Sequence, residues 1–165
     1  MDINRYQIKT PTEIVTTTLG IPEGYKQECI QEAYKIGDKQ GQQTNVKALM
    51  SSYHIWGETN MFNTLIDTIL DAIKNKISPL TDDRYIYKVD NAWTAIYKEG
   101  HYSIPHDHIP HSISFVYYLK ANINSSPLIF DGINFMIGPC DDLLVVFKSY
   151  LKHSVPIHKG EDRIC

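Results

Sequence analysis

Histidines are concentrated in one short stretch of the chain, and their spacing is the first pattern that could support chemistry. Four of the seven histidines lie between His101 and His111. Two of them, His106 and His108, stand at positions i and i+2, so on an extended segment both imidazoles point to one face with Cα atoms roughly 6–7 Å apart. A metal ion bound there needs a third ligand, and His153 on a later strand-like segment is the candidate. The pattern predicts a metal site, although histidines on a solvated loop would cluster in the same way.

Three side chains on one face of a metal ion are typical of non-haem Fe(II) oxygenases, which keep other coordination positions open. Most such sites use a His-x-Asp or His-x-Glu pair, whereas this chain has His108 in the second place. Asp107 is adjacent, but a side chain at i+1 of a strand points to the opposite face. Two ligand sets therefore stay open: three histidines, which we favour, or a local turn that admits Asp107.

Arg163 follows His153 by ten residues. In a strand–turn–strand arrangement that distance places the guanidinium in the same cavity as the metal. Arginine is permanently charged and binds a carboxylate through two parallel hydrogen bonds. The spacing therefore suits the distal carboxylate of a co-substrate such as 2-oxoglutarate.

The composition is that of an ordinary soluble domain. A chain of 165 residues with 42% hydrophobic and 21% charged residues can bury one core. Its net charge of −3 gives no support for a nucleic-acid or membrane-surface partner. No apolar run approaches the roughly 20 residues that span a bilayer, and the start lacks a signal-peptide pattern. Three cysteines without metal-type spacing indicate reduced thiols, so we expect a cytoplasmic protein.

Hydrophobic periodicity predicts helices in the first half of the chain. Apolar residues recur at helical spacing over 23–36 and form one stripe over 60–77, which we interpret as a core-packing helix. Extended segments are expected at 6–19 and 46–56. Beyond Pro79, short extended segments follow at close spacing, at 85–89, 92–97, 113–119, 128–130, 134–137, 143–147 and 154–157. Helices first and strands second predict an α+β fold, with an antiparallel sandwich or barrel that the helices cover on one face.

Segments 92–119 and 143–163 resemble the 2-oxoglutarate/Fe(II)-dependent oxygenases related to prolyl hydroxylases, and within them a phage-type set. The matching residues are Tyr97, Gly100, His106-Asp107-His108, Ser114, Val116-Tyr117-Tyr118-Leu119, Asp142 with the run 143–147, Ser149, His153-Ser154-Val155 and Arg163. Segment 44–56 also resembles the N-terminal part of the phage-type members.

The resemblance implies a double-stranded β-helix (jelly-roll, cupin-like) with N-terminal buttressing helices. Residues 1–165 would form a single domain, with 1–80 as a helical support region and 81–165 as the β-helix core. It implies Fe(II), with 2-oxoglutarate and dioxygen as co-substrates, and hydroxylation of a C–H bond. Peptidyl proline is the family-level expectation, so a peptide or protein substrate would be the partner. A phage-encoded member would act in the host cell cytoplasm.

Carried over by position, the resemblance assigns roles to six residues. His106, His108 and His153 would bind the iron. Arg163 would pair with the distal carboxylate of 2-oxoglutarate, Tyr118 would hydrogen-bond the same group, and Tyr97 would lie near the inner end of the co-substrate. Ordinary positions in a tyrosine-rich sheet are the alternative for both tyrosines.

The chain departs from the family pattern in four places. Besides His108, the proline that usually follows Phe147 is Lys148, and the glycine before that strand is Asp141. The polar residue often found two positions after the arginine is Cys165.

Two other kinds of protein stay open. Gly100 followed by His106-x-His108 fits the start of the cupin metal motif, although the glutamate of that motif is absent. A three-histidine cupin-type metal protein, or a structural zinc site, is therefore one alternative. A non-catalytic β-sandwich binding module is the other.

Overall fold

The computed structural model describes residues 12–37, 45–76, 84 and 86–165. This part of the chain contains three antiparallel sheets, each of which includes one strand from the first 50 residues. The first sheet has the order β1 (Ile14–Thr18), β9 (Leu143–Lys148), β6 (Ile113–Tyr117). The second has the order β2 (Val46–Lys47), β5 (Tyr102–His106), β10 (His153–Val155), β7 (Leu128–Phe130), β8 (Phe135–Ile137). The third has the order β11 (Arg163–Ile164), β4 (Ala95–Tyr97), β3 (Leu49–Met50).

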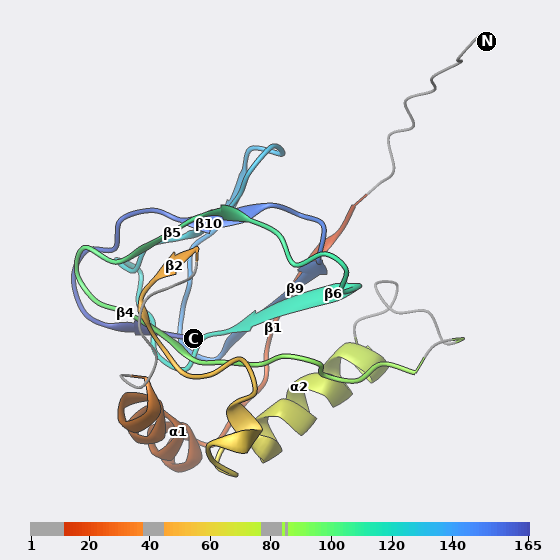
Figure 1. Ribbon diagram of the computed structural model, residues 1–165, viewed down its shortest axis with the longest axis vertical. Coiled ribbons are helices and arrows are strands. Elements are labelled where there is room, and N and C mark those ends of the chain that lie inside the picture. Colours follow the sequence, from red (N-terminus) through yellow and green to blue (C-terminus); the bar gives the residue numbers. More distant parts are fainter. Residues whose placement is uncertain (1–11, 38–44, 77–83, 85) are drawn as a thin grey trace, which may run out of the picture.

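The strands surround a common interior, and the two helices α1 (Glu23–Ile36) and α2 (Asn63–Lys76) lie together on one side of it (Figure 1). A short 3-10 helix, η1 (Ile55–Gly57), precedes α2. None of the helices in the described part of the chain is both long and apolar enough to cross a membrane.

The helices pack against the sheets through a buried apolar cluster. The apolar stripe of each helix supplies its share, because residues three and four apart lie on the same face. The members from the helices include Cys29, Ile30, Ala33 and Ile36 of α1 and Leu65, Ile69, Ala72 and Ile73 of α2. The sheets contribute Ile96, Tyr117, Leu144, Val146 and Ile164. Burial of each large aliphatic side chain stabilises the fold by about 1.5–3 kcal/mol.

A second buried cluster fills the interior between the sheets. Strand β9 contributes to both clusters, because successive side chains point to opposite faces. Leu144 and Val146 join the cluster with the helices, whereas Val145 and Phe147 join the interior cluster. Residues Tyr117 and Tyr118 divide in the same way, so only Tyr118 faces the interior. The continuous apolar run of β9 therefore reflects burial on both faces.

Most of the predicted elements are confirmed. Helix α1 has the predicted bounds, and α2 begins three residues later than predicted, with Ile77 outside the described residues. The predicted strands at 92–97, 113–119, 128–130, 134–137, 143–147 and 154–157 correspond to β4, β6, β7, β8, β9 and β10. The predicted strand at 6–19 corresponds to β1, and residues 1–11 lie outside the described part.

Two predictions are wrong in detail. Residues 86–89 form no strand, and Tyr85 lies outside the described residues. The run 46–56 is not one extended segment, because the chain leaves one sheet after β2 and enters another at β3. Strand β5 was missed as a strand, since Pro105 interrupts its apolar pattern and proline lacks the donor that a sheet needs.

Candidate active site

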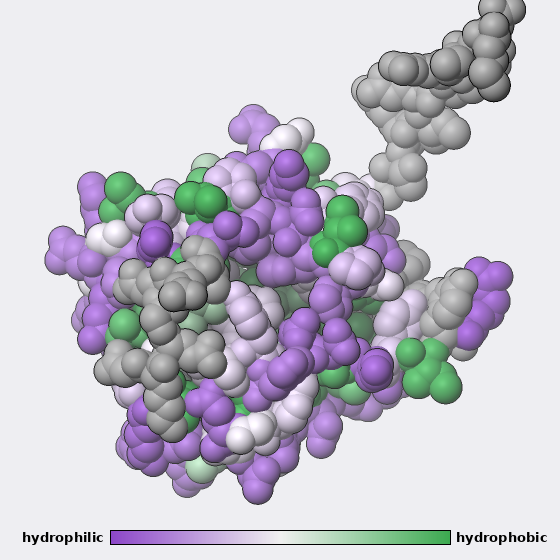
Figure 2. Space-filling view, viewed as in Figure 1, coloured by the Kyte–Doolittle hydropathy of each residue, from purple (hydrophilic) through white to green (hydrophobic). Residues whose placement is uncertain are grey.

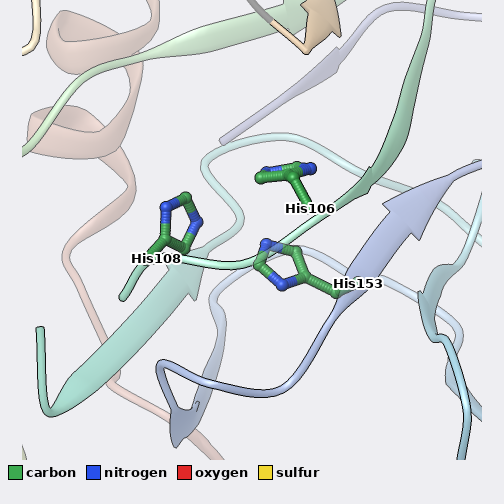
Figure 3. A group of neighbouring side chains, drawn as sticks. All are labelled: His106, His108 and His153. Atoms are coloured by element: carbon green, nitrogen blue, oxygen red, sulfur yellow. The ribbon is translucent and has the colours of Figure 1, made fainter. Parts of the chain in front are cut away.

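Three histidines meet at one end of the interior. The ligand nitrogens of His106, His108 and His153 all lie within 4.8 Å of one another. Their ring centroids are 4.5 Å apart for His106 and His153, 5.0 Å for His108 and His153, and 5.1 Å for His106 and His108. Figure 3 shows the three rings turned toward one another from two neighbouring strands and the segment after the first of them. Asp107 is not part of this group of described residues.

Sheet pairing brings the histidines together. His106 ends β5 and lies directly opposite His153, the first residue of β10. His108 follows β5 by two residues, and its N–H donates a hydrogen bond of 2.9 Å to the carbonyl of Ser149. That bond ties the segment after β5 to the turn before β10, which fixes the third ring.

Backbone carbonyls orient two of the rings. Nδ1 of His106 lies 2.7 Å from the carbonyl oxygen of Ile104, and Nδ1 of His153 lies 3.0 Å from that of Leu151. A carbonyl can only accept, so each Nδ1 carries the proton and donates it. Each Nε2 is then left with a free lone pair, which is the tautomer that a metal ligand requires.

Burial keeps the imidazoles of His108 and His153 neutral. The pKa of His108 is lowered to about 4, first by burial and then by the neighbouring His153 and His106. Burial also lowers the pKa of His153 to about 4, although the Leu151 carbonyl opposes the shift. Both rings are therefore unprotonated at neutral pH, as metal binding demands.

A buried cation lies in the same cavity as the histidines. Arg163 of β11 is 1% exposed, and its Nη2 donates a hydrogen bond of 3.1 Å to the hydroxyl oxygen of Tyr118. Its guanidinium carbon lies 4.6 Å from the ring centroid of Tyr97 and 4.9 Å from that of Tyr118. Nε and Nη1 are buried and have no hydrogen-bond partner among the described residues.

The two tyrosines do not neutralise the arginine. Burial raises the pKa of Tyr97 to about 12 and also raises the pKa of Tyr118. Both hydroxyls therefore keep their protons at neutral pH. The ring faces and the Tyr118 hydroxyl oxygen stabilise the cation without neutralising it. A buried charge with unsatisfied donors is unfavourable unless an anion pairs with it.

A cavity of about 170 Å³ joins the histidines to the arginine. This is well above the roughly 10–15 Å³ that a single water molecule needs. Its walls include all three histidines, Arg163 and Tyr97, together with apolar side chains such as Phe115, Val116 and Phe147. The space-filling view shows a hollow in the face toward the reader, with hydrophobic surface inside a hydrophilic rim (Figure 2). The donor set and the orphaned guanidinium fit a divalent metal and a small carboxylate.

Of the six residues selected from the sequence, five line this cavity. The sixth, Tyr118, contacts Arg163 through its ring and its hydroxyl oxygen. Tyr97 lies against the guanidinium. Cys165 also lines the cavity. Its backbone forms two hydrogen bonds with Ala95 of β4: each residue's N–H donates to the carbonyl oxygen of the other.

Sequence reasoning missed Trp93. Its ring centroid lies 5.7 Å from that of His108, and it lines the cavity. Trp93 and Ala95 precede Tyr97 by four and two residues, so the alternation of a strand places all three on one face. This alternation could have identified Trp93 from the sequence once Tyr97 had been selected.

Three histidines outside the cluster, two of them from the same stretch, have other contacts. Nε2 of His111 lies 3.1 Å from the carboxylate oxygen Oδ2 of Asp90, and His111 lines the cavity. His101 accepts the N–H of Lys98 through Nδ1. His158 is fully buried, and its Nε2 lies 2.7 Å from the carbonyl oxygen of Glu161.

Comparison with known proteins gives a likeness of fold. No family model matches the chain, and no curated protein matches its sequence. Among solved structures, it is similar to the viral collagen prolyl hydroxylase of Paramecium Bursaria Chlorella virus-1 in complex with 2OG, with a TM-score of 0.69 and 16% identity over 92% of this chain and 91% of that one.

Two further solved structures are similar. A prolyl-4-hydroxylase from Pseudomonas putida has a TM-score of 0.62 and 16% identity, over 92% of this chain and 88% of that one. A prolyl hydroxylase from Trichoplax adhaerens, in complex with a hypoxia inducible factor oxygen degradation domain peptide fragment, has a TM-score of 0.64 and 17% identity, over 92% and 80%. The chain therefore has the fold of the prolyl hydroxylases, and its clustered histidines and buried arginine lie in the interior of that fold.

Proposed function

We propose that this protein is a non-haem Fe(II)- and 2-oxoglutarate-dependent dioxygenase that hydroxylates a C–H bond. One observation carries the proposal: the buried guanidinium of Arg163, with Nε and Nη1 unpartnered among the described residues, opens into the same cavity as three clustered histidines. A metal site alone needs no such cation. A metal beside an anion-binding group suits a co-substrate that is chelated at one end and held by its carboxylate at the other.

The proposed ligands of the iron are His106, His108 and His153. The Ile104 and Leu151 carbonyls fix the first and last of these rings, which leaves each Nε2 for the metal. Arg163 holds the distal carboxylate of 2-oxoglutarate. Tyr118 supports the arginine and supplies a hydroxyl beside it, and Tyr97 lines the wall that the co-substrate contacts.

When bound together, Fe(II) and 2-oxoglutarate reduce dioxygen and supply the oxidant that converts a C–H bond to C–OH, with release of succinate and carbon dioxide. The protein contributes position, charge and exclusion of water. Three neutral imidazoles leave the full +2 charge of the metal ion, whereas a carboxylate ligand would leave +1. A dianionic co-substrate is attracted to that charge and to Arg163. The apolar part of the wall lowers the local dielectric constant, which strengthens both interactions.

The proposal extends to the architecture. We infer that the three sheets form a double-stranded β-helix, with α1 and α2 as buttressing helices, and that 1–165 is a single domain. Support comes from the shared buried cluster between the helices and the sheets. It also comes from the mixing of early and late strands in every sheet.

The proposed substrate is a peptide or protein, with peptidyl proline as the residue that is hydroxylated. This rests on the fold shared with the prolyl hydroxylases, one of which was solved with a peptide fragment. A cytoplasmic location is proposed because Cys29, Cys140 and Cys165 are free thiols. If the protein is phage-encoded, that cytoplasm is the host's.

A three-histidine zinc or cupin-type site is the second candidate, since three imidazoles suit zinc. It accounts for the histidines but not for Arg163. A non-catalytic binding module likewise gives no reason for the buried Arg163 beside the histidines.

Titration calorimetry of the full chain separates these functions. Fe(II) should bind with a stoichiometry of about one, and 2-oxoglutarate should then bind to the Fe(II)-loaded protein but not to His153→Ala. Succinate should form when dioxygen and a proline-containing peptide are added. Tight zinc binding without any 2-oxoglutarate binding would favour the second candidate.

A further inference from the structure

A larger groove lies outside the metal cavity and leads into it. Its volume is about 590 Å³, and His106 and His108 line its inner part. The other lining residues include Asn45, Tyr53, His54, Asn91, Trp93 and Asp107. Any substrate that reaches the three histidines from this side passes through the groove. Its side chains are therefore placed to select that substrate.

An aromatic pair connects the outer part of the groove to the metal site. The rings of Tyr53 and Trp93 meet edge to face, with centroids 5.1 Å apart and planes at 89°. Trp93 in turn meets the ring of His108 at 5.7 Å. Tyr53 is 42% exposed although it is large and aromatic. This pair presents rigid ring surface to a bound molecule at a small cost in conformational entropy.

The charged side chain that the chain itself contributes to the groove is acidic. Asp107 is the one acidic side chain among the described residues that line it, and neither lysine nor arginine is among them. The Oδ1 atom of Asp107 accepts a hydrogen bond of 3.3 Å from the Ile109 N–H, which restrains the orientation of the carboxylate. A carboxylate and aromatic rings that line the same groove favour a cation. It disfavours a phosphate backbone, which needs positive charge.

Amide side chains complete the groove. Asn45 and Asn91 each offer a donor and an acceptor, which suits the alternating N–H and C=O groups of an extended peptide. The Asn91 amide also lies 3.3 Å from Nε2 of His111, so its orientation is restrained.

We propose that this groove binds an extended peptide segment and selects a basic side chain next to the hydroxylated residue. The lysine or arginine lies against the Tyr53–Trp93 pair with its charge at Asp107, while the neighbouring residue enters the metal cavity. This inference rests on the proposed function, which assigns the cavity of the three histidines and Arg163 as the site of hydroxylation; that cavity is the inner site. It adds a rule of selectivity that the inner site does not contain, namely preference for basic over acidic flanking residues.

Peptide binding tests the rule without turnover. Three fluorescent peptides, identical except for Lys, Ala or Glu beside one proline, are titrated by anisotropy against the full chain, with and without added Zn(II). The Lys peptide should bind about five- to tenfold more tightly than the Ala peptide, as expected for one exposed ion pair and one cation–aromatic contact. The Glu peptide should bind most weakly.

Variants assign the effect to the groove. Asp107→Asn should remove the difference between the Lys and Glu peptides, and Asp107→Glu should retain it. Tyr53→Ala should weaken all three peptides, whereas Tyr53→Phe should not. Asp67→Asn, the same charge change on the exposed face of α2, is the matched control and should leave the order unchanged.

The outcomes also separate this inference from the proposed function. Charge-selective binding that depends on Asp107 supports the groove even if no Fe(II) or 2-oxoglutarate binds. Equal binding of the three peptides, no peptide binding by a chain that still binds Fe(II) and 2-oxoglutarate, or displacement of the Lys peptide by single-stranded oligonucleotide overturns it.

Discussion

The two ends of the inner cavity solve the problem of burying polar groups in different ways. At the metal end, the rings of His106, His108 and His153 lie close together, and two of them have a pKa lowered to about 4. At the carboxylate end, Arg163 is 1% exposed with two nitrogens that lack partners among the described residues. Burial removes the charge of His108 and His153 at the metal end, whereas Arg163 keeps its charge when no ligand is bound.

The difference follows from the chemistry of the side chains. Histidine can release its proton on burial, so a cluster of three rings is tolerable without a metal. Arginine stays protonated at any accessible pH, so its desolvation is not relieved in that way. The faces of Tyr97 and Tyr118 offset part of the penalty, and a bound carboxylate would offset the rest. The unpaired charge at the carboxylate end is therefore the stronger evidence that an anionic ligand binds. The histidines at the metal end are the stronger evidence for the chemistry in which that ligand takes part.

The largest expected effect is at the metal end. His153→Ala should reduce bound Fe(II) from one per chain to near zero, because two ligands that follow one another on a single segment remain without their cross-strand partner. The fold should persist, as judged by circular dichroism. Metal content after gel filtration is the measurement, with His101→Gln as the control, since that ring bonds to the backbone instead. Full stoichiometry in His153→Ala would show that the histidine cluster is not the metal site.

Replacement at the carboxylate end should separate the two functions of the cavity. Arg163→Leu should weaken 2-oxoglutarate binding by roughly 30- to 4,000-fold, which corresponds to about 2–5 kcal/mol for loss of one partner of a desolvated ion pair. Fe(II) binding should change little.

The same variant should be no less stable than the wild type when no ligand is present, because a buried unpaired charge has been replaced by an apolar side chain. Calorimetry and thermal denaturation measure the two quantities. Arg163→Lys keeps the charge without the planar fork and should give an intermediate affinity. An unchanged 2-oxoglutarate dissociation constant in Arg163→Leu would exclude this arginine from the role.

A smaller effect should appear in the pH dependence of stability of the metal-free chain. The folded-state pKa of His153 is about 4 and the unfolded value is about 6.5, so the unfolded chain binds more protons between these values. Stability from this group is fully present above pH 6.5 and is lost as the pH falls toward 4, by on the order of 3 kcal/mol. His108 shifts in the same direction but is only half-buried, so solvent screening makes its share smaller.

Urea denaturation in a chelator at several pH values between about 7 and 4.5 gives this slope. His153→Asn should flatten it, whereas Arg163→Leu should not change it, because arginine does not titrate in that range. Equal slopes for the wild type and His153→Asn would contradict the lowered pKa at the metal end.

The smallest effect is expected at the rim. His111→Gln should leave the metal stoichiometry unchanged and the free energy of unfolding within about 0.5 kcal/mol, because its ring contacts Asp90 at a partly exposed position. Metal analysis and urea denaturation are again sufficient. Loss of iron in this variant would extend the metal end beyond the three histidines.

Local patterns predicted the elements that depend on local physics. The apolar stripes of α1 and α2 fix which face of each helix is buried, so their existence could be read directly from residue spacing. The i, i+2 spacing of His106 and His108 likewise marked both residues as candidate ligands. Where the signal was weaker, the prediction failed: β-branched and aromatic residues at 86–89 suggested a strand, but strand formation requires a pairing partner.

Long-range pairing decided the rest. Only the sheet register places His153 opposite His106, and only the turn held by the His108–Ser149 bond brings in the third ring. The division of 46–50 between two sheets and the contact of Trp93 with His108 also depend on neighbours distant in sequence. The residue types of the site were therefore determined by the sequence itself. Their convergence, and the burial that keeps histidines neutral and leaves an arginine charged, were decided by the tertiary structure, because desolvation depends on what surrounds a side chain and not on what precedes it.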